Sequence, residues 1–150
     1  MENKEEEKLP VVIGASIFDI KISICDDDIP ITMDGAMYKG KQPIQTAGGV
    51  GKNLAESIYK LYGKINFISV IGDDIMGESL LQLLPEALRC NVEKMHGYPT
   101  ASRTTIVDKN GDVKLKLCDM EIYNVDMIRT HTNLLYLACV IIIDGHLPVR

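Results

Sequence analysis

The stretch TAGGVGKNLAESI, Thr46–Ile58, says most about the fold of this chain, because a run of glycines leads there directly into a helical pattern. Apolar residues recur at i, i+4 and i+7 from Leu54 to Leu61, which predicts an amphipathic helix over Lys52–Leu61. Gly63 stands where a left-handed glycine commonly ends a helix. The glycines before the helix are Gly48, Gly49 and Gly51. Such glycines suit a phosphate-binding loop, a sugar-binding loop or a tight turn.

Two known phosphate-binding motifs do not fit this stretch. A Walker A loop needs a glycine where Thr46 stands and a serine or threonine where Asn53 stands. A dinucleotide fingerprint needs its glycines directly after the first strand, but Gly14 is followed by Ala-Ser and the third glycine is missing. What remains is a set of backbone N–H groups before a helix and an amide in its first turn, which suit a hydroxyl-rich ligand. From these residues alone, a ligand site and a structural turn both stay open.

Strands and helices alternate along the rest of the chain. A buried strand begins at Pro10, and its apolar pattern continues past Gly14 to Ile24. Further elements are predicted as follows: strands over Ile65–Ile71 and Leu137–Ile143, helices over Ile75–Leu84 (with Asp73 or Asp74 as N-cap) and Asn124–Thr132, and a hairpin over Ser102–Leu117 with a type I′ turn at Asn110-Gly111. This order favours an α/β fold with a mostly parallel sheet. The hairpin and the irregular segment Ile29–Gln45 do not fit that sheet and are expected to form a small accessory sheet.

The composition argues against several classes of protein. A chain of 150 residues suits one domain with a hydrophobic core, and a net charge of −5 disfavours binding to nucleic acid polymers or anionic membranes. No apolar run reaches the roughly 18–20 residues that span a bilayer, and the start lacks the apolar region of a secretory signal, so a cytoplasmic protein is expected. The scattered cysteines and histidines show no metal-ligand spacing and predict reduced thiols. Residues 1–8, MENKEEEK, are expected to form a disordered acidic tail.

The segment AGGVGKNLAESIYKLYGKINFISVIGDDIMGESLL resembles the N-terminal signature of the PfkB, or ribokinase-like, carbohydrate kinases. That signature has a Gly-Gly-x-Gly-x-Asn element, a helix, a strand and then Gly-Asp-Asp. The matching residues are Gly48, Gly49, Gly51, Asn53, Gly72, Asp73, Asp74 and Gly77, and Gly14 and Asp19 match the first strand. Within the family, the chain is similar to the pseudouridine kinase branch at Met33–Ala36, Asp119–Ile122 and the closing Asp144-x-x-Leu-Pro.

The resemblance implies a substrate-binding role for five residues. Asp19 would accept hydrogen bonds from sugar hydroxyls, Gly48 and Gly49 would let the backbone approach the sugar, and Asn53 would hold it through its amide. His146 stands where the branch has an asparagine and is a candidate donor to the ligand, with a loop histidine without a role as the alternative. The chain departs from many relatives at Ile17, where they carry a polar residue that contacts the sugar.

The resemblance also implies what the whole enzyme does. It would transfer a phosphoryl group from ATP, with Mg²⁺, to a hydroxyl of a ribose-type sugar or nucleoside, with pseudouridine favoured. The segments Ile29–Gln45 and Ser102–Leu117 would close over this small-molecule substrate as a lid, and lids pair into a homodimer in several relatives.

The family's second signature, a Gly-Ala-Gly-Asp element that carries the catalytic base and borders the nucleotide pocket, does not occur in these residues. Residues 9–150 are therefore expected to form the N-terminal, substrate-binding part of a truncated kinase domain, without a catalytic residue or a bound cofactor of its own. The apolar strand near Val140–Ile143 points the same way, because such a strand normally feeds further covering elements. The alternative is a truncated, non-catalytic protein that acts as a sugar-binding or dimerisation partner.

Overall fold

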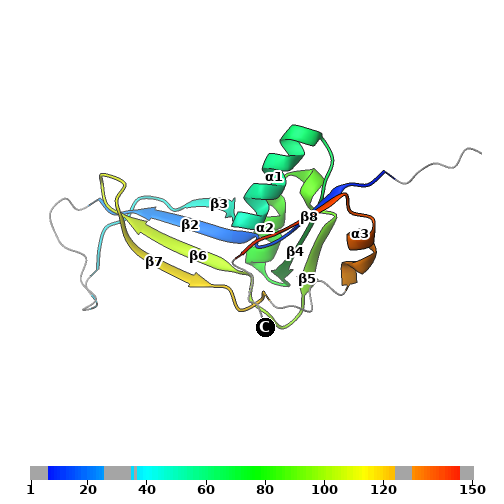
Figure 1. Cartoon of the computed structure of the whole chain (residues 1–150). Helices are drawn as coiled ribbons and strands as arrows, with labels where there is room; N and C mark the ends of the chain where they lie inside the picture. The colour runs from blue at the N-terminus through cyan, green and yellow to red at the C-terminus, as the bar shows by residue number, and fades with distance from the viewer. Residues whose placement is uncertain (1–6, 26–34, 36, 124–129, 146–150) are drawn as a thin grey trace, which may run out of the picture.

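A parallel four-stranded sheet forms the core of the protein in the computed structural model, which describes residues 7–25, 35, 37–123 and 130–145 (Figure 1). Its strand order is β5-β4-β1-β8, and every neighbouring pair is parallel. The strands are β1 (Pro10–Ile13), β4 (Asn66–Gly72), β5 (Asn91–Met95) and β8 (Val140–Ile143). This core sheet, with the helices that pack on it, confirms the predicted α/β class.

Both faces of the core sheet are covered, because successive side chains of a strand point to opposite faces. On one face, Val12 and Phe67 pack with Ala55 of helix α1 (Val50–Tyr62). On the other, Ile13 and Val70 belong to a cluster that Leu134 of the short helix α3 (Thr132–Tyr136) packs against. Helix α2 (Ile75–Leu83) places Leu80 against Phe18 and Ile71 in a third cluster. Buried on both sides, the central strands show the continuous apolar runs seen in the sequence.

A second, accessory sheet projects from the core (Figure 1). Its strand order is β3-β2-β6-β7, in which β2 and β6 are parallel and the outer pairs are antiparallel. The strands are β2 (Ile17–Ser23), β3 (Ile44–Gly48), β6 (Ser102–Val107) and β7 (Val113–Asp119). The predicted hairpin is thus present and belongs to the predicted accessory sheet. The pattern from Pro10 to Ile24, however, divides at residues 14–16 into β1 in the core and β2 in the accessory sheet.

Two local features of the structure differ from what the sequence predicts. The turn at Asn110-Gly111 is not type I′, because Gly111 alone has a positive φ and Asp108 Oδ1 accepts hydrogen bonds at 2.9 Å from the backbone N–H groups of Asn110 and Asp112. Strand β5 was not predicted, because its charged sequence NVEKM lacks an apolar pattern and pairing with β4 defines it. Of the helix expected over Asn124–Thr132, residues 124–129 lie outside the described part; Thr130 and His131 form a 3-10 turn that leads into α3 at Thr132.

The described residues include no helix long and apolar enough to cross a bilayer. Residues 1–6 of the expected tail, and residues 29–34 and 36 of the expected irregular segment, lie outside the described part, as do residues 26–28 before it.

Candidate functional site

The glycine stretch lies where the end of β3, the start of α1 and the β1–β2 connection meet. Gly49 is the N-cap of α1, with φ 102° and ψ 140°. A Cβ at this position would lie 2.2 Å from the carbonyl oxygen of Ala15, so only glycine fits. The same oxygen accepts a hydrogen bond of 3.0 Å from the N–H of Lys52. The start of α1 is therefore held against the β1–β2 connection by a close backbone contact.

Asp19 lies beside this stretch, on β2. A Cβ on Gly48 would lie 2.0 Å from Asp19 Oδ2, so the glycine leaves the space that the carboxylate occupies. The carboxylate is bound in bidentate fashion by Arg103 of β6, with Nε 2.9 Å from Oδ1 and Nη2 2.6 Å from Oδ2. Asp19 and the glycine stretch, to which the family resemblance gives a shared role in substrate binding, are thus direct neighbours in the fold.

A small cavity of about 190 Å³ opens at this place. Its lining residues are Ala15, Ile17, Gly49, Val50, Asn53, Arg103, Cys118, Met120 and Asp144. The volume lies below the roughly 300–1,000 Å³ typical of pockets for drug-sized ligands, which suits a small ring. Of the predicted substrate-binding residues, Gly49 and Asn53 line the cavity directly, and Asp19 reaches its wall through Arg103.

Asp144 lines the cavity next to the start of α1. It follows β8 and its side chain is 1% exposed. Its Oδ2 accepts hydrogen bonds from the N–H of Gly51 at 2.9 Å and of Ala15 at 3.2 Å. Carboxylates are favoured at helix N-termini, where backbone N–H groups have no partner within the helix. Asp144 therefore fixes the start of α1 relative to both sheets.

Lys52 of the glycine stretch is bound to its own helix. Its Nζ lies 2.7 Å from Glu56 Oε2, and Lys60 Nζ lies 2.7 Å from Oε1 of the same carboxylate. Hydrogen bonds from Lys52 and Lys60 lower the pKa of Glu56 to about 2. This pairing leaves the glycine stretch without the lysine that a phosphate-binding loop presents to its ligand, which agrees with the failed Walker A pattern.

A buried polar network lies next to the site, at the β1–β2 connection. The hydroxyl of Tyr123 donates to the carbonyl oxygen of Ser16 and accepts from the Ser16 N–H at 2.8 Å, while Ser16 Oγ and Ser69 Oγ lie 2.9 Å apart. Burial raises the pKa of Tyr123, and hydrogen bonds from the two serines only partly oppose this. The phenol therefore stays protonated at neutral pH and ties the chain that follows β7 to the β1–β2 connection.

Sequence reasoning missed two residues of this site. The residues around Arg103 do not indicate a binding role, because their pattern predicts only the strands of a hairpin. Asp144 appeared in the Asp144-x-x-Leu-Pro match, but without a role. The predicted candidate His146 lies outside the described residues.

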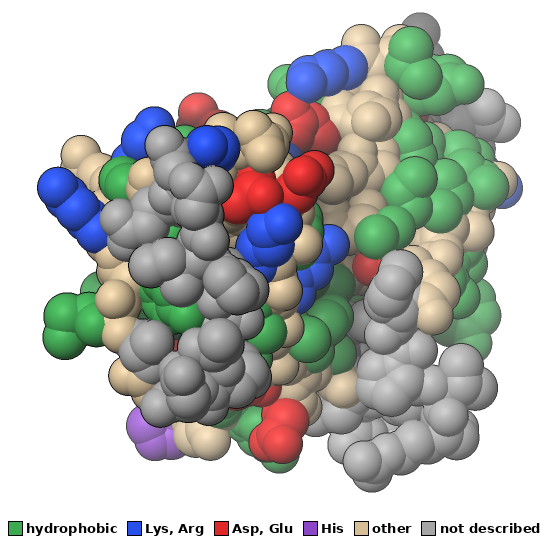
Figure 2. All heavy atoms as spheres, turned by 90° about the vertical axis from the view of Figure 1, so that its left-hand side faces the viewer, with side chains coloured by type: hydrophobic (Ala, Val, Ile, Leu, Met, Phe, Trp, Pro, Cys, Tyr) green, Lys and Arg blue, Asp and Glu red, His purple; other side chains and the backbone are tan. Residues whose placement is uncertain are grey.

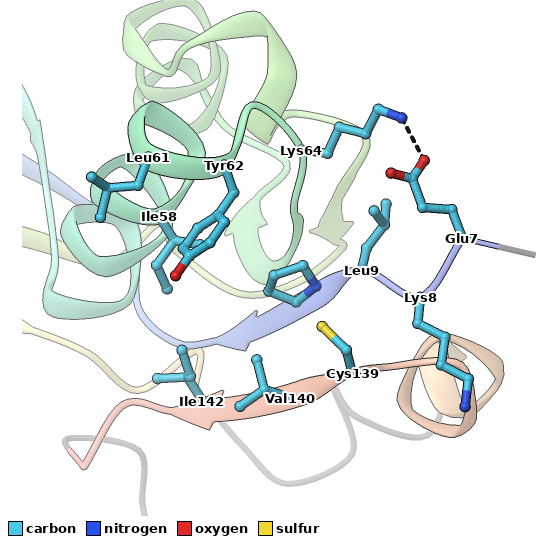
Figure 3. Close-up of a pocket in the computed structure, with 11 residues that line it drawn as sticks. Glu7, Lys8, Leu9, Ile58, Leu61, Tyr62, Lys64, Cys139, Val140 and Ile142 are labelled. Atoms are coloured by element: carbon cyan, nitrogen blue, oxygen red, sulfur yellow. Dashed lines mark hydrogen bonds and ion pairs between the residues drawn. The ribbon is translucent and has the colours of Figure 1, made fainter.

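A second cavity, of about 620 Å³, lies between α1 and β8 (Figure 3). Ile58 and Tyr62 project from α1 towards Val140 and Ile142 of β8, and Lys64 pairs with Glu7 at its edge. Its lining is mainly apolar and includes none of the predicted site residues. Nor does any part of the described chain hold a group of three or more His, Cys, Asp or Glu side chains placed to bind a metal ion.

Comparison with known proteins identifies the family. The model of the "pfkB family carbohydrate kinase" matches residues 8–144, which is most of the chain. The chain belongs to the pfkB family of carbohydrate kinases. The glycine stretch, Asp19 and the Gly72-Asp73-Asp74 element all lie within the matched range.

Two relatives show how much of a longer protein this chain matches. It is 29% identical to the uncharacterized sugar kinase YeiI of Escherichia coli K12, covering 97% of this chain and 40% of that protein. It is 30% identical over 105 residues to the pseudouridine kinase of the same strain, covering 66% of this chain and 33% of that protein. The chain therefore spans about 40% or less of the length of these curated relatives.

Solved structures confirm the ribokinase-like fold. The structure of Arabidopsis thaliana ribokinase, complexed with ribose and ATP, superposes with a TM-score of 0.73 at 20% sequence identity, covering 95% of this chain and 47% of that one. At this identity, the superposition establishes the fold alone.

Proposed function

We propose that this chain forms the sugar-binding part of an ATP-dependent carbohydrate kinase, which phosphorylates a hydroxyl of a ribose-type sugar or nucleoside. The observation that supports this best is the small cavity lined by Gly49, Asn53 and Arg103, with Asp19 bound to Arg103. Carboxylate, guanidinium and amide groups around a small cavity suit a polyhydroxylated ring. Pseudouridine is the favoured substrate, because a relative named pseudouridine kinase is 30% identical over 105 residues.

Charges of both signs are mixed on one face of the molecule, at the outer end of the accessory sheet. On the face that carries the outer end of this sheet, acidic and basic side chains lie next to one another (Figure 2). Such mixing provides no extended field of one sign to attract a polyanion. We propose that the accessory sheet acts as the lid over the sugar and excludes water, which would otherwise compete as phosphoryl acceptor.

ATP and Mg²⁺ belong to the proposed reaction of the whole enzyme, in the cytoplasm. We assign neither of them to residues of this chain. In this proposal, residues 9–150 bind and orient the sugar. The catalytic base and the nucleotide pocket are proposed to lie outside these residues.

Titration of pseudouridine and ribose into the purified chain tests the proposal. Asp19→Asn keeps the size of the side chain but removes its charge, and it should weaken binding about tenfold or more, because hydrogen bonds to charged groups contribute roughly 1.5–3 kcal/mol. Isothermal calorimetry measures the dissociation constants. Asp112→Asn, in the exposed hairpin connection, is the matched control and should bind like the unmodified chain. Absence of binding by the unmodified chain would contradict the proposed function.

A second candidate, a non-catalytic protein that pairs through its lid, is favoured by exposed apolar residues of the accessory sheet. Ile44, Val113 and Leu117 are 58%, 51% and 57% exposed. Pairing of two accessory sheets would cover such residues. Sedimentation of the unmodified chain at several concentrations distinguishes a stable dimer from a monomer.

A further inference from the structure

We propose that Arg103 is a substrate-binding residue, and that it forms with Asp19 a mixed donor–acceptor pair selecting a neutral ligand with two neighbouring hydroxyl groups. This inference rests on the proposed function and goes beyond it, because it names a residue and a chemical criterion for the substrate. The starting point is that Arg103 both binds Asp19 and lines the small cavity.

Arg103 keeps unused hydrogen-bond donors at the cavity. A guanidinium group carries five N–H donors, and two of its nitrogens, Nε and Nη2, donate to Asp19. Among the described residues, none accepts a hydrogen bond from Nη1. The side chain is 39% exposed, against 19% for Asp19. The guanidinium is therefore held rigidly by one edge while its other edge is accessible to a ligand.

Asp19 likewise keeps acceptor capacity. An ionised carboxylate has about four lone-pair sites, and the bidentate contact with Arg103 uses two of them. A hydroxyl group is both a donor and an acceptor, so it can donate to Asp19 and accept from Arg103 at once. Two neighbouring hydroxyls would use both members of the pair.

The charge of the pair narrows the ligand class further. Asp19 alone would attract cations, and Arg103 alone would attract phosphates or carboxylates. Paired at 2.6 Å, their charges compensate each other. An anionic ligand would meet the Asp19 carboxylate, and an amine would meet the guanidinium. A neutral polyol avoids both repulsions.

A purely structural role for Arg103 is the competing explanation. Asp19 and Arg103 are direct partners in the parallel pairing of β2 and β6, so their ion pair also connects the two strands. In that case the loss of Arg103 would lower the stability of the accessory sheet without changing which sugars bind. The two explanations therefore differ in ligand selectivity.

The test compares ribose with 2-deoxyribose, which lacks one hydroxyl of the neighbouring pair. In the unmodified chain, ribose should bind about tenfold or more tightly than 2-deoxyribose. Arg103→Ala should weaken ribose binding about tenfold or more and bring the ratio of the two dissociation constants close to one. Arg103→Lys keeps the charge but loses the planar fork, so it should also lose most of the selectivity. Lys116→Ala, an exposed cation of the same hairpin, should keep both constants.

The outcomes separate this inference from the proposed function. Tight ribose binding by the Arg103 variants, with the selectivity of the unmodified chain, overturns the role of Arg103 and leaves the proposed function standing. Failure of the unmodified chain to bind ribose or pseudouridine overturns both. Unfolding temperatures identify any variant that does not fold, and if Arg103→Ala is one of these, the selectivity of Arg103→Lys decides.

Discussion

At the scale of single residues, the site depends on the absence of a side chain at Gly49. Its φ of 102° and the 2.2 Å between a hypothetical Cβ and the carbonyl oxygen of Ala15 both require glycine. Gly63, at the other end of α1, has a similar φ of 76° but no atom within 4 Å of a hypothetical Cβ. The two positions therefore share the backbone requirement and differ in crowding.

Alanine substitutions at these two glycines should separate the two effects. Gly63→Ala should cost about 1 kcal/mol in the free energy of unfolding, the price of a left-handed alanine. Gly49→Ala should lower the free energy of unfolding by at least about 3 kcal/mol, because the alanine would strain the backbone and also clash with the carbonyl group of Ala15. Urea denaturation measures both values. Equal costs would show that the contact with Ala15 relaxes easily.

At the scale of elements, Asp74 connects α2 to the start of the accessory hairpin. As N-cap it accepts a hydrogen bond of 2.7 Å from the N–H of Gly77, and it also accepts bonds of 2.8 Å from the N–H and 2.6 Å from the hydroxyl of Thr100. Burial raises the pKa of Asp74, but the hydrogen bonds from Thr100 and Gly77 outweigh it, so the pKa is lowered overall. The preceding Asp73 is exposed, and its carboxylate lies 3.5 Å from Nδ1 of His96.

Asp74→Ala should therefore lower stability at pH 7 by about 1–2 kcal/mol, whereas Asp73→Ala should change it by less than about 0.5 kcal/mol. Because the folded-state pKa of Asp74 is below its unfolded value near 4, its contribution is present above that pH and is lost as the pH falls. The difference between the unmodified chain and Asp74→Ala should therefore shrink below about pH 4. Thermal unfolding across pH 2–7 measures it, and a difference that grows on acidification would be incompatible with this account.

At the scale of the whole molecule, Asp144 joins the parts that local patterns leave separate. It reaches Ala15 across 129 positions and Gly51 across 93 positions of sequence. The strand before it, β8, is the outer strand of the core sheet, and Val140, Ile141 and Ile143 are 47%, 44% and 60% exposed. Strands of parallel sheets are usually covered on both faces. We therefore propose that further residues cover β8 in a larger domain.

Asp144→Ala should destabilise the chain by about 2–4 kcal/mol, because two buried N–H groups lose their acceptor. Asp144→Asn keeps one carbonyl oxygen as acceptor and should cost less. Urea denaturation gives both values, and amide exchange at Ala15 and Gly51 reports the local effect. A cost below about 0.5 kcal/mol for Asp144→Ala would mean that water replaces the carboxylate without loss.

Much of the fold follows from local sequence. The helix from Val50 to Tyr62, its end at Gly63, the cap of α2 and the hairpin all agree with their predicted positions to within a few residues. Spacing, capping residues and glycine act over a few positions, so they are visible in sequence. Strand β5 is not, because its pairing partner rather than its composition defines it.

The sequence by itself determined the order of most strands and helices, the glycine start of α1 and, through the family pattern, the candidate role of Asp19. Only the tertiary structure decided that β2 leaves the core sheet, that Arg103 holds Asp19 from 84 positions away and that Asp144 caps α1. The physical reason is the range of the interactions. Helix periodicity and turn chemistry depend on near neighbours, whereas ion pairs and caps between distant segments exist only once the chain has folded.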